Sequence, residues 1–299
     1  MSFFNNLIVS AVQLMPKSVV GFFSKRYIAG EDIEDAVKVT RELNRQGIYS
    51  TIDVLGEAVQ NREEAIESKN KALEVLDTIV QFKLNANLSI KPTQMGLAID
   101  EDFAYEQVRS LVQKAKEINS FIRIDMEDFP YTDATFRLLR RLKQDYDNLG
   151  VVVQAYLIRT YDDIVVLNKI GTNYRLCKGI YIEPASIAYK DKEVIRKNYV
   201  KDLELILKNG NYVGIATHDE YLVNEAYRLI KELNIPKNKF EFQMLLGVRE
   251  DLRNKINNDG YKVRIYVPFG KDWYAYSTRR LKENPQMAGQ IFRNLFSLK

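Results

Sequence analysis

The sequence is poor in the residues that build disulfides, metal sites and many hydrolytic triads. It contains one cysteine, Cys177, and one histidine, His218, in 299 residues. A single cysteine excludes an intramolecular disulfide and fits a reducing compartment. One histidine argues against a histidine-based metal site, and a Ser-His-Asp triad would have to use that one residue. We therefore expect no bound metal and a cytoplasmic location.

Blocks of like charge and long uninterrupted apolar runs are also missing. The net charge is only +4, and Lys and Arg are interspersed with Asp and Glu throughout. Without a basic block, we expect no nucleic-acid partner. The apolar start, "MSFFNNLIVSAVQLMPKSVVGFF", lacks a basic leader and is interrupted by Asn5, Gln13 and Lys17. We expect it to pack on the body of the protein, with at most peripheral membrane contact.

Short β-rich runs alternate with charged, helix-patterned stretches along most of the chain. The runs are "STIDVLGE" from Ser50, "NLSIKPTQMGL" from Asn87, "FIRIDMED" from Phe121, "GVVVQAYL" from Gly150, "YRLCKGIY" from Tyr174, "YVGIATHD" from Tyr212, "FEFQMLLG" from Phe240 and "KVRIYVPFG" from Lys262. Eight such repeats predict an α/β fold, a (β/α)₈ TIM-type barrel. An open doubly wound sheet is the alternative, weakened because no GxGxxG follows the first run. We expect residues 1–48 to form a helical segment packed on the barrel and residues 49–299 to form the barrel.

Polar residues within a run are spaced by two positions. Because side chains of a strand alternate between its two faces, the polar residues of each run lie on one face. Helices cover the outer face of a barrel strand, and the polar set should therefore point inward. Those near the amino ends predict a structural charge network of Arg123, Glu241 and Arg264. Those near the carboxyl ends, where barrel enzymes place their chemistry, are candidate functional residues: Lys91, Asp125, Gln154, Lys178, His218, Gln243 and Tyr266.

The stretch "DWYAYSTRRLKENP" from Asp272 predicts a final helix, because Asp272 can cap its start and Pro285 forbids its continuation. Helical spacing puts four polar residues on a single face: Tyr276, Arg279, Arg280 and Glu283. The roughly opposite face, predicted to pack on the protein, carries Tyr274, Thr278 and Leu281. A solvated surface stripe would explain two adjacent arginines, and so would an anion-binding site.

The segment "VRIYVPFGKDWYAYSTRRLKEN", taken with "IRIDMED", "VVQAY", "YRLCKGIYIEP", "ATHD" and "FEFQMLLG", resembles the proline dehydrogenases. The resemblance runs from about "DVLGEA" to the end of the sequence. It implies a compact monofunctional bacterial flavoenzyme whose last helix lies across the barrel mouth. The implied reaction oxidises L-proline to Δ1-pyrroline-5-carboxylate in proline catabolism, with noncovalent FAD and a membrane quinone as electron acceptors. Any membrane contact would be peripheral, at the inner face of the cell membrane.

The resemblance also implies roles for individual residues. Asp125 and Arg175 would be catalytic, with Arg175 beside the reactive edge of the flavin. The implied proline-binding residues are Lys91, Tyr181, Leu245, Tyr266, Tyr276, Arg279 and Arg280. The implied FAD-binding residues are Met126, Gln154, Arg175, Cys177, Lys178, Gly179, Thr217, His218, Gln243 and Glu283.

Two residues depart from the family pattern, and two other functions compete with the flavoenzyme. Ile180 stands where alanine is common and should narrow the proline slot, whereas Cys177 replaces a common valine and should only fill space. One rival is a Schiff-base lyase or aldolase with Lys91 or Lys178 as nucleophile, which does not explain Arg279 and Arg280. The other is a flavin-binding module without turnover. Loss of Lys91 or of one of the arginines would have indicated such a module, and all of them are present.

Overall fold

Eight parallel strands close into a barrel in the computed structural model, which describes residues 20, 21 and 24–283. They follow chain order, and β1 pairs with both β2 and β8. The strands are β1 Tyr49–Val54, β2 Ala86–Ile90, β3 Ile122–Ile124, β4 Leu149–Gln154, β5 Asn173–Cys177, β6 Val213–Ala216, β7 Phe240–Leu245 and β8 Val263–Phe269. Each run picked out in the sequence supplies one strand. The closed barrel confirms the predicted TIM-type fold and excludes the open sheet.

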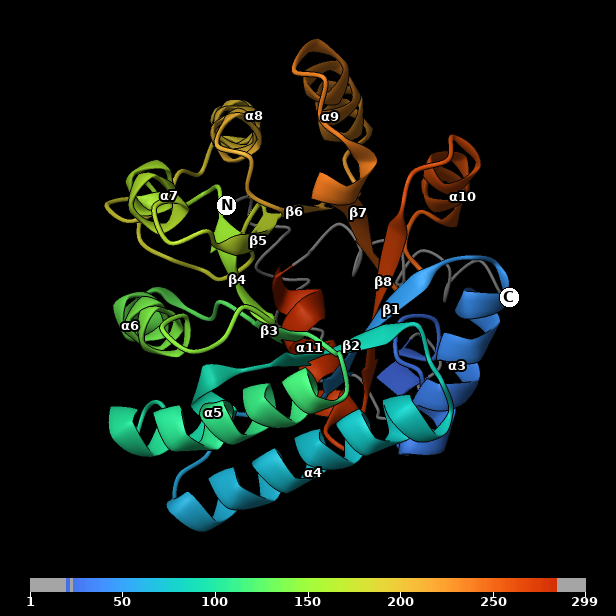
Figure 1. The fold of residues 1–299 in the computed structure, drawn as a ribbon, viewed down its shortest axis with the longest axis vertical. Coiled ribbons are helices and arrows are strands. Elements are labelled where there is room, and N and C mark those ends of the chain that lie inside the picture. The colour runs from blue at the N-terminus through green and yellow to red at the C-terminus, as the bar shows by residue number, and fades with distance from the viewer. Residues whose placement is uncertain (1–19, 22–23, 284–299) are drawn as a thin grey trace.

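Seven helices follow the first seven strands and surround the barrel (Figure 1). They are α4 Arg62–Gln81, α5 Glu101–Glu117, α6 Thr132–Leu142, α7 Thr160–Asn168, α8 Lys192–Lys208, α9 Glu220–Glu232 and α10 Glu250–Asn258. Side-chain oxygens of Asn61, Asp100 and Asp191 accept backbone N–H groups at the starts of α4, α5 and α8. These caps satisfy donors that the first helical turn leaves unpaired.

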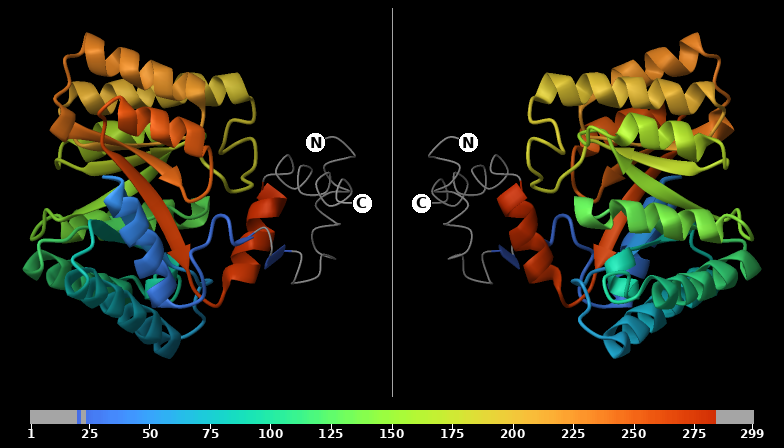
Figure 2. Two further views of the ribbon diagram at one scale, coloured as in Figure 1. Left: turned by 90° about the vertical axis from the view of Figure 1, so that its right-hand side faces the viewer. Right: turned by 90° about the vertical axis from the view of Figure 1, so that its left-hand side faces the viewer.

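Two further helices take unusual places. Helix α3, Ile33–Arg45, precedes the first strand and packs outside the barrel against β1 and β8. Helix α11, Trp273–Glu283, follows β8 but lies across the end of the barrel, near the centre of Figure 1 and to one side of the strands in Figure 2. Helix α3 thereby covers the strands that a helix after β8 would otherwise cover. The final helix is confirmed, while the division at residues 48 and 49 stays a prediction.

The packing face of α11 differs from the prediction. Trp273 and Tyr276 pack against Tyr27, Ile28 and Leu55, and Ser277 is fully buried. Tyr274 and Thr278, which we expected to pack, are half-buried, as Trp273 and Tyr276 also are, and the side chain of Leu281 lies outside the described part. The segment before α3, which contains Tyr27 and Ile28, packs against α11 over the barrel mouth and so determines which face of α11 is buried.

The apolar core lies between the strands and their surrounding helices, and the barrel interior is polar. Ile52, Leu88 and Phe242 belong to the continuous core. At the amino end of the interior, Arg264 forms an ion pair with Glu241 at 2.6 Å. This part of the predicted charge network is confirmed.

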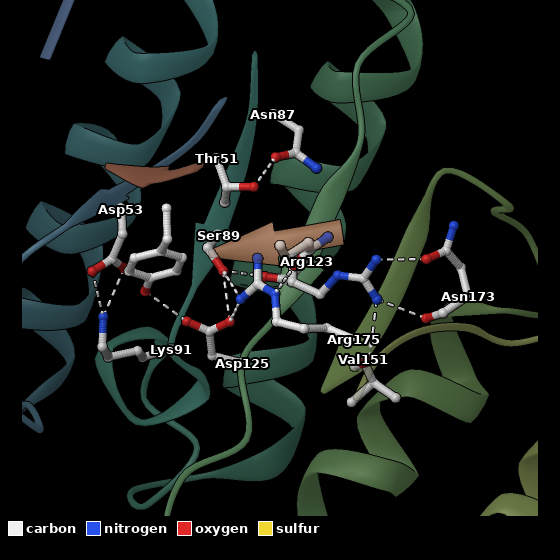
Figure 3. Close-up of polar contacts among 12 residues, drawn as sticks. Thr51, Asp53, Asn87, Ser89, Lys91, Arg123, Asp125, Val151, Asn173 and Arg175 are labelled. Carbon is white, nitrogen blue, oxygen red and sulfur yellow. Dashed lines mark hydrogen bonds and ion pairs between the residues drawn. The ribbon is translucent and has the colours of Figure 1, made fainter. Parts of the chain in front are cut away.

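The prediction for Arg123 was only partly right, because Arg123 donates hydrogen bonds to the neutral groups of Val151 and Asn173. The Arg123 guanidinium is 2% exposed. It donates to the backbone oxygens of Val151 and Asn173 at 3.1 and 2.7 Å, and to the Asn173 side chain (Figure 3). Carbonyl oxygens therefore solvate this buried cation. The sequence had suggested an ion pair instead, because Arg123 lies near the amino end of its strand.

The described residues contain neither a membrane-spanning helix nor a metal-binding cluster. None of the helices there combines the length and apolar character needed to cross a bilayer. In the same residues, no group of three or more His, Cys, Asp or Glu side chains is arranged to hold a metal ion.

Candidate active site

A cavity of about 600 Å³ opens at the carboxyl ends of the strands, beneath α11. Every predicted site residue whose side chain is described lines it: Lys91, Asp125, Met126, Gln154, Arg175, Cys177, Lys178, Gly179, Tyr181, Thr217, His218, Gln243, Leu245, Tyr266 and Tyr276. The backbone positions of Arg279, Arg280 and Glu283 lie in α11, and their side chains fall outside the described part. The volume is within the range typical of small-molecule and cofactor sites.

The floor of the cavity is built around Asp125, the residue that follows β3. Its Oδ1 accepts hydrogen bonds from Ser89 Oγ at 2.6 Å and from Arg175 Nη1 at 2.7 Å (Figure 3). Its Oδ2 accepts a hydrogen bond from the Tyr266 hydroxyl at 2.9 Å. The Arg175 guanidinium also lies over the Tyr266 ring, 5.2 Å from its centroid. Residues of β2, β5 and β8 therefore fix one carboxylate and one guanidinium at the bottom of the site.

A line of hydrogen bonds continues from Arg175 toward the amino end of the barrel. Arg175 Nε donates to Gln243 Oε1 at 2.6 Å, and Gln243 Nε2 donates to Glu241 Oε1 at 2.6 Å. Gly214 leaves room for this link, since a Cβ there would lie 2.3 Å from the Gln243 amide nitrogen. Glu241 in turn meets Arg264. The predicted structural network and the predicted functional residues thus form one connected system that orients Arg175.

A second ion pair lies beside this floor. Lys91 follows β2, and its ammonium donates to both carboxylate oxygens of Asp53 on β1, at 2.7 and 2.9 Å (Figure 3). Burial lowers the pKa of Lys91, but the carboxylates of Asp53, Asp125 and Glu127 outweigh burial and raise that pKa. The Lys91 amine is therefore held as a cation and is not a free-base nucleophile.

The potential nucleophiles His218 and Cys177 are restrained in different ways, one by a hydrogen bond and the other by burial. His218 Nε2 accepts a hydrogen bond from the Leu245 backbone N–H at 2.9 Å, so the assigned tautomer carries its proton on Nδ1. Burial raises the pKa of Cys177 to about 11, despite the lowering effect of nearby Arg175. A thiol with such a pKa is uncharged near neutral pH and unreactive.

The loop after β5 forms a cavity wall that depends on glycine. Gly179 has φ +109°, a conformation that other residues rarely adopt, and a Cβ there would lie 2.0 Å from the Tyr156 ring. Next to it, Ile180 lines the cavity and is 45% exposed. On the other side, Lys178 Nζ lies 3.4 Å from Asp219 Oδ2. The wall therefore presents backbone and a cation to a ligand, with an aliphatic side chain at its edge.

Several residues of the site escaped the sequence analysis. Glu127 lines the cavity, and its carboxylate accepts hydrogen bonds from the backbone N–H and hydroxyl of Thr93 at 2.9 and 2.7 Å. Burial raises the pKa of Glu127. The only available signal was its place two residues after Asp125 in "IDMED". Apolar lining residues also went unpredicted, since nothing separates them from core residues in a sequence: Val152, Ala216, Met244 and Val248.

Comparisons with known proteins bear on this site and its fold. A family model described as "Proline dehydrogenase" matches residues 36–293. Proline dehydrogenase 1 of Bacillus subtilis (strain 168) is 37% identical over 272 residues, which are 91% of this chain and 90% of that protein. The proline dehydrogenase of Deinococcus radiodurans is 35% identical over 289 residues, covering 95% of this chain and 93% of that one.

A solved structure agrees with these relatives. The proline utilization A protein (PutA) from Bdellovibrio bacteriovorus, inactivated by N-propargylglycine, superposes with a TM-score of 0.82 at 26% identity. The match covers 87% of this chain but 32% of that one, so the chain spans about a third of the PutA protein. By sequence over most of its length, and by fold, this chain belongs to the proline dehydrogenase family.

Proposed function

We propose that this chain oxidises L-proline to Δ1-pyrroline-5-carboxylate, an oxidation of a CH–NH group in proline catabolism, with bound FAD as electron acceptor. The observation that carries the proposal is the cavity of about 600 Å³ in which the buried Arg175–Asp125 pair adjoins Lys91 and the tyrosines Tyr266 and Tyr276. It offers one end suited to a carboxylate and a wall suited to a small saturated ring.

The residues present fit a flavin. Proline dehydrogenases are generally FAD-dependent, and the wall at Gly179 lets backbone approach a planar ligand closely. Gln154, Arg175 and Gln243 supply amide and guanidinium groups for the ring system, and Lys178 supplies a cation for the phosphates. The other residues proposed to hold FAD are Met126, Cys177, Gly179, Thr217, His218 and Glu283. When bound, FAD supplies the centre that accepts a hydride equivalent from proline.

FAD is proposed to bind noncovalently. A covalent link needs a nucleophilic atom whose lone pair is available, and neither of the two obvious candidates in the cavity presents one. Burial keeps the pKa of Cys177 at about 11, and the Nε2 atom of His218 is occupied by the Leu245 N–H. Neither group is therefore prepared to attack the flavin ring.

Proline is proposed to bind between α11 and the floor of the cavity. Lys91, Arg279 and Arg280 would bind its carboxylate, since guanidinium groups match a planar carboxylate with paired donors. Tyr181, Leu245, Tyr266 and Tyr276 would enclose the pyrrolidine ring. Such binding would orient the ring carbon next to the nitrogen for hydride transfer, which is how positioning contributes to the rate.

Arg175 and Asp125 are proposed to act together. The guanidinium of Arg175 would stabilise negative charge as it develops at the electron acceptor. Asp125 holds Nη1 of Arg175 at 2.7 Å and is itself held by Ser89 and Tyr266. Because Ser89 and Tyr266 already hold Asp125 in place against Arg175, little reorganisation is needed during the reaction.

The lyase alternative is not favoured. The amine of Lys91 is held as a cation by Asp53, whereas a Schiff base requires a neutral lysine. Borohydride reduction with a carbonyl substrate should therefore trap no adduct at Lys91 or Lys178. Release of flavin from the purified protein, with reduction of that flavin by L-proline and formation of the cyclic imine, tests the proposed function against both rivals.

A membrane quinone is proposed as the final electron acceptor. This follows from the family resemblance, and the protein would then meet the inner face of the cell membrane transiently and peripherally. Flotation with vesicles before and after reduction by proline, together with turnover on a soluble quinone analogue, tests the acceptor and the membrane contact separately.

A further inference from the structure

The Asp53–Lys91 pair stands at the edge of the proposed proline site, and only one of its two members faces the cavity. Lys91 lines the cavity, whereas Asp53 is 1% exposed and lies behind it on β1. The two carboxylate oxygens of Asp53 accept hydrogen bonds from the Lys91 ammonium at 2.7 and 2.9 Å. An ammonium carries three N–H donors, so the contacts with Asp53 can engage two and, among the described residues, leave one for a ligand.

Lys91 shares the cavity and its edge with several charged or titratable groups. The described ones are Asp53 on β1, Asp125 and Glu127 in the loop after β3, Arg175 on β5, Tyr266 on β8 and Tyr276 on α11. The side chains of Arg279 and Arg280 on α11 lie outside the described part. Burial opposes the charge on Lys91, and Asp53 contributes more than Asp125 or Glu127 to raising its pKa. Without Asp53, the Lys91 cation would lose its nearest stabilising partner.

We propose that Asp53 is a positioning residue, which holds the Lys91 ammonium charged and turned so that one N–H faces the cavity and binds the carboxylate of the substrate. The proposal rests on the proposed function, because proline supplies that carboxylate. Asp53 does not touch the substrate and acts only through Lys91.

Removing the Asp53 charge has two opposed consequences, which pH separates. While Lys91 stays protonated, a neutral residue at position 53 removes an anion that competes with the substrate carboxylate. Above a lowered Lys91 pKa, the amine becomes neutral and attraction to a carboxylate is lost. A role in folding alone would not move the pH dependence of binding, so the pH profile is the informative measurement.

The experiment measures binding of cyclopentanecarboxylate to the full FAD-loaded chain by calorimetric titration between about pH 6.5 and 9.5. This ligand has the ring size and carboxylate of proline but no amine to oxidise. Its carboxyl group titrates near pH 4 to 5, as other carboxylic acids do, so a change in Kd over this range reports the protein. We expect a nearly constant Kd for the wild type. For Asp53→Asn we expect Kd to rise roughly tenfold toward the top of the range, because each pH unit above the pKa removes nine-tenths of the cation.

Two comparisons separate positioning from a general loss of structure. Asp202→Asn removes another buried carboxyl group, on α8 away from the cavity, and should keep the wild-type profile. Lys91→Met and the double variant Asp53→Asn with Lys91→Met should both bind the ligand weakly, and the double variant should bind it no more weakly than Lys91→Met. The double variant replaces a buried ion pair by neutral side chains, so it remains informative if Asp53→Asn alone does not fold.

Two results would overturn the proposal. One is an Asp53→Asn profile that matches the wild type. The other is a further loss of binding when Asp53→Asn is added to Lys91→Met, because Asp53 would then act by a route other than Lys91. Failure of L-proline to reduce the wild-type flavin would instead refute the proposed function, and the binding measurements do not depend on that reaction.

Discussion

Glu241 should make the stability of the barrel depend strongly on acid pH. Its side chain lies in the barrel interior, 2.6 Å from Arg264 and 3.1 Å from Lys262, and accepts a hydrogen bond from Gln243. Burial raises the pKa of Glu241, but Arg264, Lys262 and Gln243 outweigh burial and hold that pKa at about 2, against an ordinary value of 4.5. Folding therefore favours the ionised carboxylate.

The direction and size of the effect follow from this difference. A carboxyl group with a depressed folded-state pKa stabilises the fold above its unfolded pKa, and the contribution is lost as pH falls toward the folded pKa. The two pKa values of 4.5 and about 2 correspond to roughly 3 kcal/mol, at about 1.4 kcal/mol per pH unit. About 1.4 kcal/mol of this should be gone by pH 3.5.

The assay is the free energy of unfolding in urea at pH 7, 4.5 and 3.5 for the wild type and for Glu241→Gln. At pH 7 the variant should be less stable by about 3 to 5 kcal/mol, because Arg264 is left buried without a carboxylate. Between pH 4.5 and 3.5 the wild type should lose about 1 kcal/mol more than the variant. Adding Arg264→Met to the variant removes the uncompensated cation and should restore part of the loss at pH 7. Equal losses in both proteins between pH 4.5 and 3.5 would refute the reasoning.

Three further predictions concern the ligands. Arg279→Met or Arg280→Met should raise KM for proline by the equivalent of roughly 2 to 5 kcal/mol while FAD stays bound, and unchanged proline binding in both would identify the helix face as a solvated surface stripe. Ile180→Ala should relax discrimination between proline and 4-hydroxyproline by about 1 kcal/mol, measured as the ratio of their kcat/KM values. The effect should be small because the half-exposed Ile180 side chain can move partly aside for the hydroxyl group. An unchanged ratio would show that Ile180 points away from the ring. Acid denaturation should release free flavin, and yellow colour retained in the precipitate would contradict noncovalent binding.

The barrel could be predicted from the sequence because each strand carries its own local signal. All eight β-rich runs became strands in chain order. Strand parity also predicted that Arg264, Glu241 and Asp125 share the interior, since alternation depends only on position along one strand. The family resemblance then named cavity residues that alternation could not distinguish from structural ones, such as Cys177 and Gly179.

Contacts between strands could not be predicted in the same way. The pairing of Asp53 with Lys91 depends on the register of β1 against β2, which places Asp53 opposite Ser89. The Glu127–Thr93 contact joins the segment after β3 to the short 3-10 helix Pro92–Met95 after β2, and the whole barrel sets their relative position. The packing face of α11 was missed because Tyr27 and Ile28, far away in the sequence, meet that helix over the barrel mouth.

The central claim, that this cavity oxidises proline through a bound flavin, is tested most directly by one spectrum. The purified chain, loaded with FAD, is mixed with L-proline in the absence of oxygen while its visible absorbance is followed. The account predicts that the oxidised flavin bands bleach with L-proline and that the Lys91→Met variant needs much more proline to reach the same bleaching. Flavin bands that persist at saturating L-proline in the wild type would contradict it.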